Sequence, residues 1–472
     1  MIIKTTPESI ASYLRDASNF SGGNAEEVVI PENSEELVAF LRNETRNVTI
    51  SGAGTGLTAS RIPSEGVIIS LERLNKILKE DEASVQVGPA VTLNNLQSFL
   101  STSGWFYPPN PTEKWASLGG TLATNASGSR SYKYGVTRNY VEEVELVLVD
   151  GRKTILKRGL KISEPLKLED GSQIYFPDIS YQSPKCKNAA GYFVQPDMDW
   201  IDLFIGSDGT LGIFTKIVLR LLPRPADFVS GILFFEEERT CWELIPKIRS
   251  FNGQKIDPCS LEYFDHNSLE RLKVKYKNIP THSRAALFFE QDISQSKDYD
   301  LTLENWFEFL SEENVFLEDS WFAQGEKDTQ LFHDFRHDVP IIVNEENSRA
   351  GRVKLGTDMA VSDNLFISMM EFYQETLKTS GLDHVIFGHL GDNHLHINLL
   401  PKESQMDDAQ HLYDKMVGQI LKWNGTISAE HGIGKIKKKY FAKMVGPEGL
   451  KDLRKIKDRL DEGNRLGFGN IL

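Results

Sequence analysis

Short strands and helices alternate near the start of the chain, and this alternation restricts the possible folds more than any other feature of the sequence. The run EVVIPENSEELVAFLRN predicts a strand, a turn and a helix that begins at an Asn-Ser-Glu-Glu cap. The runs GVIISLERLNKIL and ASVQVGPAVTLNNLQSFLSTSG repeat the order of strand and then helix. We therefore expect an α/β arrangement in the N-terminal part of the chain.

A glycine-rich turn follows the predicted strand NVTI without a break. The alternating glycines of SGAGTGL, Ser51–Leu57, allow backbone N–H groups to approach a phosphate closely, because glycine has no Cβ and tolerates positive φ. The turn differs from a Rossmann fingerprint, since Pro63 stands where the helix of that motif would run. From the residues alone, a phosphate-binding loop and an ordinary tight turn both remain open.

A long stretch rich in Gly, Ser and Asn begins at Phe106 and ends at the strand VEEVELVLVDGRKTIL. It has too little periodic apolar content for a regular core element, and such a stretch inside a domain is usually functional or disordered. The hairpin turn predicted at Asp150 and Gly151 favours order. A second glycine-rich turn, IGSDGTLGI, precedes a domain boundary that two nearby prolines indicate at about residue 224.

The length of 472 residues predicts two or three domains, because one ordinary core does not reach this size. We expect a first domain over residues 1–224. Residues 225–422 alternate strands and helices again, which indicates an antiparallel sheet backed by helices. Residues 423–472 return to loop and helix. The predicted fold class is therefore α+β.

Net charge and apolar content exclude several classes of protein. A net charge of −14 argues against binding to nucleic acid or to an anionic membrane surface, because both need a basic excess. The sequence has no apolar run near the roughly 20 residues that span a bilayer. Three widely spaced cysteines indicate neither a disulfide framework nor a thiolate zinc site. We expect a cytoplasmic protein that is at most peripheral to the inner face of the membrane.

The run GHLGDNHLHINLL concentrates histidines on a predicted strand. In a strand, His394, His396 and Asn398 share one face while the intervening apolar residues face the core. A turn before them would bring His389 back beside His396, which is an arrangement that suits a metal. A further ligand can come from Glu430 or its neighbour in GTISAEHGIGK. From spacing alone, hydrogen-bonded core histidines remain the alternative.

Five motifs in order carry a resemblance to a known family. They are SGAGTGLTAS, SLGGTLATNASGSRSYKYGVTRNYV, IGSDGTLGIFTKIVLRLLP, GHLGDNHLHINL and SAEHGIGK. With them the chain resembles the FAD-linked 2-hydroxy-acid dehydrogenases of the vanillyl-alcohol-oxidase superfamily, over nearly its whole length. The resemblance implies an FAD-binding domain of the PCMH type, followed by a substrate or cap domain and a C-terminal segment that completes the active site.

The resemblance also implies which residues hold the cofactor. The GAGTG turn would cradle the pyrophosphate, and the long stretch and the second glycine-rich turn would line the rest of the dinucleotide. Neither SGAGTGL nor NASGS contains a histidine, so we expect the FAD to be bound non-covalently. The implied FAD contacts are Ser51, Gly52, Ala53, Gly54, Thr55, Gly56, Leu57, Pro109, Gly119, Gly120, Ala123, Thr124, Asn125, Gly128, Gly135, Asp208, Gly212 and Ile213.

A divalent metal, Zn²⁺ or Mn²⁺, is implied in the same way. The positions of His389, His396 and Glu430 match the family's metal ligands. His431 matches the base that lies beside the flavin. The positions that hold the carboxylate and hydroxyl end of the substrate match Arg336, Lys354 and Asn398.

Two departures from the family pattern lie within these motifs. The usual GDGNLH is here GDNHLH, so that Asn393 and His394 replace a Gly-Asn pair. His394 is then an extra ligand, a substrate contact or a spectator. Asp208 stands where a glutamate is common, which shortens one side chain beside the flavin.

The activity that the resemblance implies is oxidation of a D-2-hydroxy acid, of the D-lactate, D-2-hydroxyglutarate or glycolate class, to the 2-keto acid. The electrons would pass to an acceptor other than O2, namely a quinone, an electron-transfer flavoprotein or a cytochrome, and we expect a homodimer. Two alternatives are a metal-dependent hydrolase, which would use His389, His396 and Glu430 around a water, and a non-catalytic flavoprotein subunit.

Overall fold

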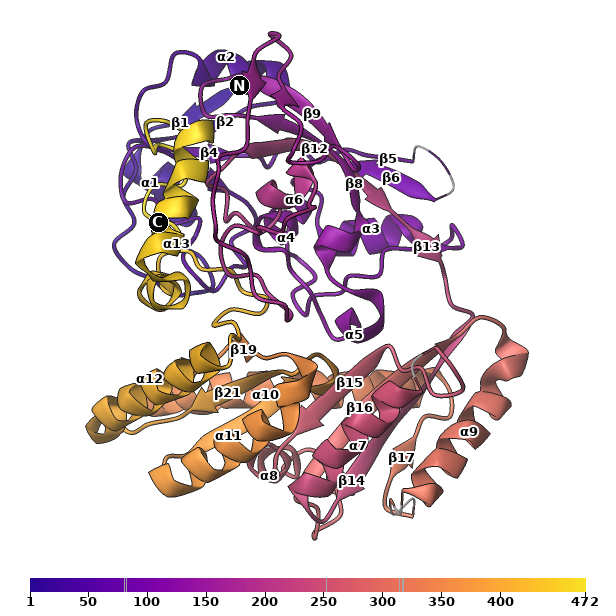
Figure 1. Cartoon of the computed structure of the whole chain (residues 1–472). Helices are drawn as coiled ribbons and strands as arrows, with labels where there is room; N and C mark the ends of the chain where they lie inside the picture. Colours follow the sequence, from indigo (N-terminus) through magenta and orange to yellow (C-terminus); the bar gives the residue numbers. More distant parts are fainter. Residues whose placement is uncertain (80, 82, 252, 314, 316–317) are drawn as a thin grey trace.

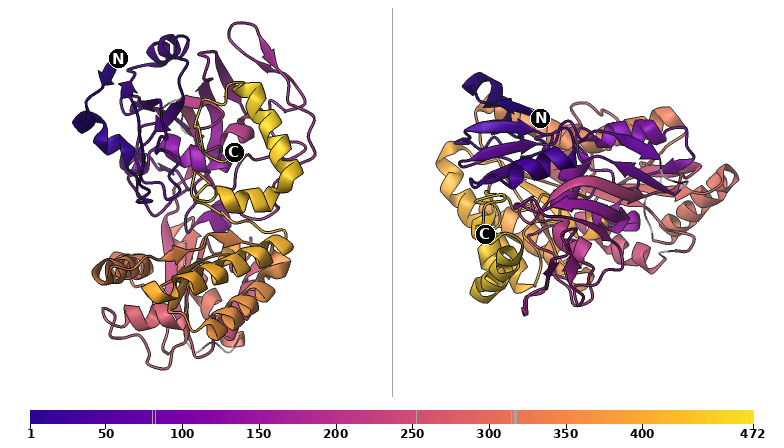
Figure 2. Two further views of the ribbon diagram at one scale, coloured as in Figure 1. Left: turned by 90° about the vertical axis from the view of Figure 1, so that its left-hand side faces the viewer. Right: turned by 90° about the horizontal axis from the view of Figure 1, so that it is seen from above.

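The computed structural model describes residues 1–79, 81, 83–251, 253–313, 315 and 318–472. The chain forms two halves, which lie one above the other in Figure 1. The upper half contains the N-terminal elements and also the C-terminal helix α13 (Lys438–Leu460). The left view in Figure 2 again shows this helix in the half that contains the N-terminus. The chain thus leaves the upper half, builds the lower half, and returns.

Two sheets organise the upper half. The first has the order β1 (Ile2–Lys4), β2 (Glu27–Ile30), β4 (Val67–Ser70), β3 (Val48–Ser51), and its last three strands are parallel. The second is antiparallel, with the order β5 (Ile77–Lys79), β6 (Ser84–Val87), β12 (Ile213–Arg220), β8 (Val141–Val147), β9 (Lys153–Lys157). Two small ribbons pair β10 (Leu166–Lys167) with β11 (Gln173–Ile174) and β13 (Leu222–Pro223) with β7 (Trp105–Phe106).

Short helices connect these strands. They are α1 (Pro7–Ile10), α2 (Ser34–Leu41), α3 (Leu93–Leu100), α4 (Leu118–Thr124), α5 (Ser131–Tyr134) and α6 (Trp200–Phe204), with 3₁₀ turns η1 (Ala11–Leu14) and η2 (Thr137–Tyr140). The predicted cap of α2 is confirmed, because the Asn33 side chain accepts a hydrogen bond from the Glu36 N–H at 2.8 Å. The predicted hairpin turn at Asp150 and Gly151 is also confirmed between β8 and β9.

One element predicted from the sequence is wrong. The run GVIISLERLNKIL does not continue from a strand into a helix: β4 is followed by a turn and then by strand β5. Ile77 of β5 pairs with Val87 of β6, so the backbone groups of this segment are satisfied by a sheet ladder. The six residues between the two strands are too few for a packed helix.

The lower half is built on one large antiparallel sheet. Its order is β17 (Trp321–Phe322), β14 (Asp227–Phe235), β16 (Ala285–Ile293), β15 (Ser260–Phe264), β20 (His384–His389), β21 (His394–Leu399), β18 (Leu355–Gly356), and β19 (Met359–Ala360) also pairs with β21. Its helices are α7 (Glu238–Ser250), α8 (His266–Leu272), α9 (Tyr299–Glu312), α10 (Glu326–Ala350), α11 (Phe366–Ser380) and α12 (Met406–Lys422). Its 3₁₀ turns are η3 (Ser296–Asp298), η4 (Asp363–Leu365), η5 (Leu390–Asp392) and η6 (Glu403–Gln405).

Helices cover both faces of this sheet because its strands carry apolar residues on both faces. In β14, Leu233 belongs to the core shared with α7, α9, α11 and α12, whereas Phe234 belongs to the core shared with α8 and α10. In β21, Leu395, Ile397 and Leu399 belong to the first of these cores. The alternate residues of β21, from His394 to Asn398, therefore face the other way, as predicted.

Ion pairs hold the two halves together, and the C-terminal segment is tied to the first sheet within the upper half. Arg130 of the upper half pairs with Glu290 of β16 at 2.6 Å, and Lys133 pairs with Asp292 at 2.7 Å. The C-terminal segment returns to the first sheet, where the Val48 N–H donates to the Arg465 carbonyl at 2.9 Å. Among the described residues, none of the helices combines the length and apolar character that a bilayer crossing requires.

Candidate active site

A cavity of about 1780 Å³ is lined by residues of both halves. A pocket for one drug-sized ligand usually has roughly 300–1,000 Å³, so this cavity has room for an extended cofactor together with a small substrate. The implied FAD contacts that line it are Ser51, Gly52, Ala53, Gly54, Thr55, Gly56, Leu57, Gly119, Gly120, Ala123, Thr124, Gly128, Asp208, Gly212 and Ile213. The cavity lining does not include Pro109, Asn125 or Gly135.

The glycine-rich loop after β3 presents free backbone donors to this cavity. Within the described part of the chain, the N–H groups of Gly54, Thr55 and Gly56 have no protein acceptor. Gly54 has a φ of +81°, and a Cβ there would lie 2.2 Å from Arg61 Nη1. A Cβ at Gly52 would lie 2.9 Å from Ser117 Oγ. The loop therefore fits the phosphates of an extended dinucleotide, which need close backbone approach and unpaired donors.

Two implied FAD residues outside the lining shape its wall. Asn125 has a left-handed φ of +49° at the end of α4, and its Oδ1 accepts a hydrogen bond from the Arg138 N–H at 3.0 Å. Gly135 has a φ of +78°, and a Cβ there would lie 2.5 Å from Asn139 Oδ1. Both residues position the backbone next to the lining, and their contact with a cofactor stays a prediction.

Asp208 is buried beside the cavity. Its Oδ2 accepts hydrogen bonds from the N–H groups of Ile433 and Gly434, each at 2.8 Å. Burial raises the pKa of this carboxyl group to about 6, although the two N–H groups act in the opposite direction. Its Oδ1 has no hydrogen-bond partner among the described residues. Asp208 thus joins the second glycine-rich turn to the loop that follows Glu430.

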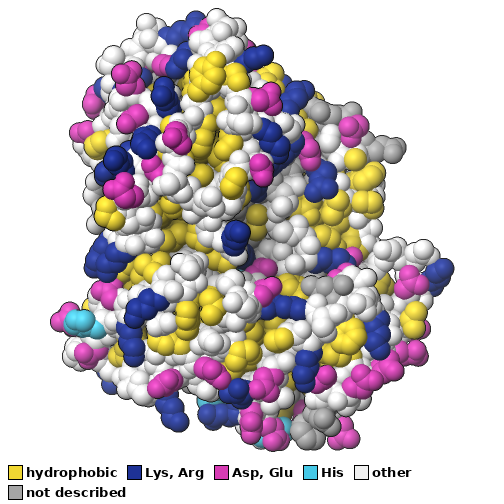
Figure 3. All heavy atoms as spheres, in the orientation of Figure 1, with side chains coloured by type: hydrophobic (Ala, Val, Ile, Leu, Met, Phe, Trp, Pro, Cys, Tyr) yellow, Lys and Arg dark blue, Asp and Glu magenta, His cyan; other side chains and the backbone are white. Residues whose placement is uncertain are grey.

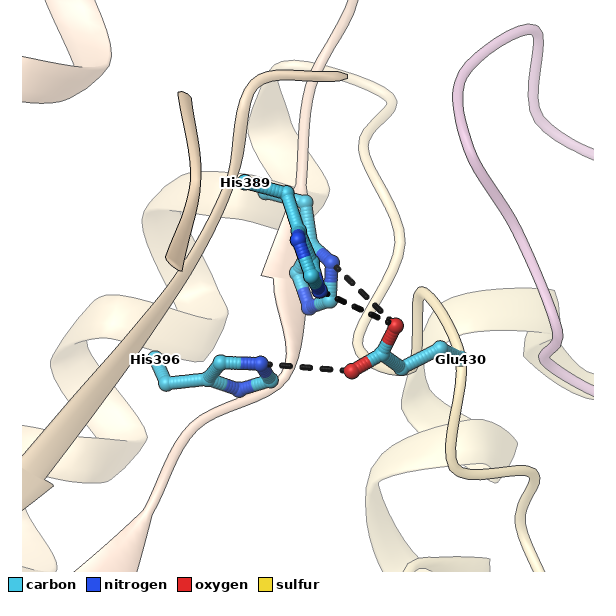
Figure 4. Close-up of side chains that lie close together, drawn as sticks. His389, His396 and Glu430 are labelled. Atoms are coloured by element: carbon cyan, nitrogen blue, oxygen red, sulfur yellow. Dashed lines mark ion pairs between the residues drawn. The ribbon is translucent and has the colours of Figure 1, made fainter. Parts of the chain in front are cut away.

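The three predicted metal ligands come together at one wall of the cavity (Figure 4). His389 Nε2 lies 3.3 Å from Glu430 Oε2, and His396 Nε2 lies 3.3 Å from Glu430 Oε1. The turn η5 brings the two strand ends together, so that the rings of His389 and His396 are 5.8 Å apart between centroids. With His394, the nitrogen and oxygen atoms that could bind a metal lie within 4.8 Å of one another. Imidazole nitrogen and carboxylate oxygen are a donor set that suits a divalent transition metal.

Each of the two paired histidines is oriented from outside the cluster. His389 Nδ1 lies 2.6 Å from Glu262 Oε1, and His396 Nδ1 lies 3.3 Å from the Thr357 carbonyl oxygen. Burial alone would raise the pKa of Glu262, but the charges of His389 and Arg336 lower it to about 2. Burial lowers the pKa of His389, and Glu262 and Glu430 outweigh this and raise it to about 9. Glu262 was not singled out from the sequence, where it appears only as an acid within the apolar strand SLEYF.

Asp358 is a second carboxylate that the sequence analysis missed. Its Oδ2 lies 3.2 Å from His431 Nδ1 and 2.6 Å from Lys437 Nζ, and its Oδ1 lies 2.9 Å from His394 Nε2. Burial would raise its pKa, but His431 and Lys437 hold it well below the usual range. The backbone N–H groups that follow Ser428 also donate to it. The only sequence signal was an aspartate two positions after the short strand Leu355–Gly356.

His431 lines the cavity, and its Nδ1 atom contacts Asp358. Its ring is parallel to that of His396 within 17°, at 5.5 Å between centroids. Burial lowers the pKa of His431 to about 4, and Asp358 acts in the opposite direction. The Nδ1 atom faces Asp358, so the neutral ring carries its proton there and leaves Nε2 as an acceptor.

A buried lysine offsets the negative charge of the cluster. Lys187 Nζ lies 3.2 Å from Asp392 Oδ2 and 3.6 Å from Glu430 Oε2. Burial would lower the pKa of Lys187, but the two carboxylates raise it. The sequence offers no pattern that would have identified this residue, because it lies 243 positions before Glu430 in an irregular segment.

Of the three predicted substrate contacts, two line the cavity and one does not. Lys354 and Asn398 line the cavity, and Lys354 Nζ donates to Asn344 Oδ1 at 2.6 Å. Burial lowers the pKa of Lys354, which forms no ion pair with a carboxylate among the described residues. Arg336 lies outside the cavity lining, where its Nε is 3.2 Å from Glu262 Oε2. The structure therefore places Arg336 behind His389, whereas Lys354 lines the cavity together with Arg61, Arg352 and Lys437.

Comparisons with known families and proteins agree with this architecture. A family described as "FAD linked oxidases, C-terminal domain" matches residues 224–471, and an "FAD binding domain" matches residues 25–156. The chain is 27% identical to D-lactate dehydrogenase of Anaerostipes hadrus, over 97% of this chain and 92% of that protein. It is 26% identical to the glycolate oxidase subunit GlcD of Bacillus subtilis, over 97% of this chain and 91% of that protein.

Solved structures show the same fold. Superposition on p-cresol methylhydroxylase gives a TM-score of 0.72 at 14% identity and covers 99% of this chain and 93% of the other. Superposition on alkyldihydroxyacetonephosphate synthase gives 0.70 at 16% identity, with 98% and 82% covered. The mixed α+β architecture predicted from the sequence, an FAD-binding domain with a second domain on a large antiparallel sheet, is therefore confirmed. Because the C-terminal-domain family spans more than half of the 472 residues, the chain belongs to the FAD linked oxidases.

Proposed function

We propose that this protein is an FAD-dependent dehydrogenase that oxidises a D-2-hydroxy acid to the 2-keto acid with the help of a divalent metal. The observation that carries the proposal is that one cavity is lined by both the glycine-rich loop Ser51–Leu57 and the cluster of His389, His396 and Glu430. A cofactor held along that loop would end near the cluster. The relatives named D-lactate dehydrogenase and D-2-hydroxyglutarate dehydrogenase support this substrate class.

The oxidation removes a proton from the substrate hydroxyl oxygen and a hydride from the carbon that carries this hydroxyl, and we propose that His431 takes the proton. Its Nδ1 is held by Asp358, so that Nε2 is the atom that accepts the proton from the substrate hydroxyl. A bound FAD would supply the two-electron acceptor for the hydride. A cation held by His389, His396 and Glu430 would lower the pKa of the substrate hydroxyl.

The substrate carboxylate meets a cation and a hydrogen-bond donor in this arrangement. Lys354 lines the cavity without an ion-pair partner in the described part of the chain, and it offers a positive charge to the carboxylate. The Asn398 side chain lies on the strand face that carries His396 and offers an amide. Arg336 acts at a distance in this proposal, because its charge helps to keep Glu262 ionised beside His389.

A panel of D- and L-2-hydroxy acids tests the proposed function. The purified protein is mixed anaerobically with each acid, and bleaching of the flavin absorbance is recorded with and without a chelator. We expect bleaching by D-acids, and we expect the chelator to slow it. A protein without flavin absorbance that takes up no added FAD contradicts the proposal and favours the metal-dependent hydrolase. A bound flavin that none of the acids bleaches favours the non-catalytic subunit.

The identity of the electron acceptor belongs to the same proposal. We propose a quinone, an electron-transfer flavoprotein or a cytochrome, in a cytoplasmic homodimer. On the face seen in Figure 3, acidic and basic side chains are interspersed over both halves. Re-oxidation of the reduced flavin is measured with each acceptor and with O2. Faster re-oxidation by O2 than by any of the three acceptors contradicts this part of the proposal.

A further inference from the structure

His394 lies inside the cluster rather than beside it. Its side chain is fully buried, and its ring centroid is 5.2 Å from that of His389 and 4.6 Å from that of His396. The Nδ1 atom lies 4.0 Å from Glu430 Oε2, the oxygen that also faces His389. The position that holds asparagine in the family pattern is therefore occupied here by a third imidazole at the same carboxylate.

The outer nitrogen of each of the three rings faces an acceptor. His394 Nε2 lies 2.9 Å from Asp358 Oδ1. His389 and His396 have the corresponding contacts with Glu262 and with the Thr357 carbonyl. Histidines that bind a metal usually donate their other ring N–H to a carboxylate or a backbone carbonyl, which fixes the ring and the tautomer. The inner nitrogens, His389 Nε2, His394 Nδ1 and His396 Nε2, then offer lone pairs to a metal, once His389, whose pKa is raised to about 9, has lost its second proton to metal binding.

A purely structural role does not account for the inner nitrogen of His394. Neither ring nitrogen of His394 forms a hydrogen bond among the described residues. Nε2 lies 2.9 Å from Asp358 Oδ1, and a proton on Nε2 facing this carboxylate leaves Nδ1 as an acceptor without a partner. An unpaired polar atom in a fully buried side chain is costly, because it has lost its water without gaining a partner. The free lone pair lies within the same 4.8 Å group as the ligand atoms of His389, His396 and Glu430.

We propose that His394 is a third imidazole ligand of the divalent cation, together with His389, His396 and Glu430. The inference rests on the metal site of the proposed function. It adds that this site selects among divalent metals. Imidazole favours zinc and similar transition metals, whereas Mn²⁺ and Mg²⁺ prefer oxygen ligands. A site with three imidazoles and one carboxylate therefore selects zinc over manganese more strongly than a site in which an asparagine replaces one imidazole.

Zinc X-ray absorption on the wild-type protein tests the coordination directly. The protein is loaded with one equivalent of zinc, with its flavin in place, and the scattering is fitted for the number of imidazole rings. We expect three imidazoles. This measurement needs no variant, so it decides the question even if substitutions at position 394 impair folding.

Metal affinity in matched variants tests the selectivity. His394→Asn restores the residue of the family pattern, and His384→Asn is the control. His384 lies in the same sheet but outside the cluster, with its ring nitrogens on Asn267 and the Leu382 carbonyl. We expect His394→Asn to weaken zinc binding by about 10- to 100-fold, to weaken Mn²⁺ binding much less, and to retain FAD. His384→Asn should bind both metals as the wild type does.

The outcomes separate this inference from the proposed function. Zinc bound through two imidazoles, with the same zinc affinity in His394→Asn, overturns the role of His394 and leaves the proposed function intact. A wild-type protein that holds FAD but binds neither zinc nor Mn²⁺ overturns both the third ligand and the metal assistance. Three imidazoles together with a reduced preference for zinc in His394→Asn support the inference.

Discussion

At the scale of single residues, Asp358 determines how two histidines are presented to the cavity. One oxygen faces His394 and the other faces His431, while Lys437 neutralises the carboxylate. A charge that is buried needs this many partners, because an unpaired buried carboxylate is strongly disfavoured. The orientations of His431, the proposed base, and of His394, the proposed third imidazole ligand, therefore both depend on the Asp358 side chain.

Replacement of His431 by Ala removes the proposed proton acceptor. Positioned general bases contribute about 10²- to 10⁴-fold to a rate, and we expect a loss of kcat in that range. The bound FAD and metal should remain, because the cluster of His389, His396 and Glu430 is not altered. Rapid reduction of the flavin by the best D-2-hydroxy acid is the measurement. His411→Ala, at an exposed position of α12, is the control, and equal rates in the two variants would remove the assignment of the base.

Asp208 makes the stability depend on pH. Burial raises its pKa from 3.8 to about 6 in the folded state, so the folded protein binds more protons between these values. The contribution of this carboxyl group to the free energy of unfolding is fully present below about pH 4 and is lost as the pH rises through about 6. At roughly 1.4 kcal/mol per pH unit, the lost contribution is about 3 kcal/mol.

We expect Asp208→Asn to lack this loss. The measurement is urea unfolding at pH 4.5 to 7.5 with a fixed FAD concentration, for the wild type, Asp208→Asn and the exposed control Asp300→Asn. Parallel pH curves for the wild type and Asp208→Asn would contradict the buried carboxyl group as the cause.

At the scale of elements, two buried or half-buried contacts clamp the segment around α5 to the sheet of the lower half. Arg130 forms two hydrogen bonds to Glu290, at 2.6 and 3.0 Å, and Glu290 is almost completely buried. Lys133 pairs with Asp257 and Asp292. Since α5 follows the stretch that lines the cavity, this clamp also sets the distance between the two walls of the site.

Substitution of Arg130 by Met leaves Glu290 buried without its main partner. Breaking a buried ion pair from one side costs about 3–5 kcal/mol, and we expect this loss in the free energy of unfolding. Arg349→Met, which removes an exposed pair with Glu345, should cost about 0–1 kcal/mol. Urea unfolding followed by tryptophan fluorescence compares the two variants. A cost for Arg130→Met no larger than that for Arg349→Met would show that the clamp contributes little.

At the scale of the whole molecule, the site exists only where the two halves meet. The loop after β3 and the turn before β12 come from the upper half, and the histidines come from the lower half. Glu430 and His431 belong to the segment that returns from the lower to the upper half, between α12 and α13. Separation of the halves would therefore take the glycine-rich loop away from the histidines.

FAD should stabilise the assembled molecule in proportion to its occupancy. A ligand at 100 times its Kd adds about 2.7 kcal/mol to the free energy of unfolding of the part that binds it. We expect the Tm to rise with FAD concentration and to reach its largest value when FAD and zinc are both present. Thermal unfolding at several FAD concentrations is the measurement, with riboflavin, which lacks the pyrophosphate, as the control. An equal rise with riboflavin would contradict pyrophosphate binding by the loop Ser51–Leu57.

Local patterns were enough to predict several parts of the structure. The alternation in HLHINL placed His394, His396 and Asn398 on the face opposite the leucines, because the period of two belongs to any strand. The cap of α2 and the hairpin at Asp150 could also be predicted, because each depends only on residues that are neighbours in the sequence. The strand β5 was missed because its ladder partner β6, and not its own propensity, decides its conformation.

The sequence by itself determined many of the elements, the glycine-rich loop and the supply of histidines, while the tertiary structure decided the conformation of β5 and which groups surround the histidines. Glu262, Asp358 and Lys187 are far from the histidine motif along the chain and follow no periodic pattern, yet the folded chain puts all three against it. Arg336 carries a family-like motif and still lies behind the cluster, on Glu262. Contacts of this kind follow from how sheets and helices pack across hundreds of residues, and local spacing holds no information about them.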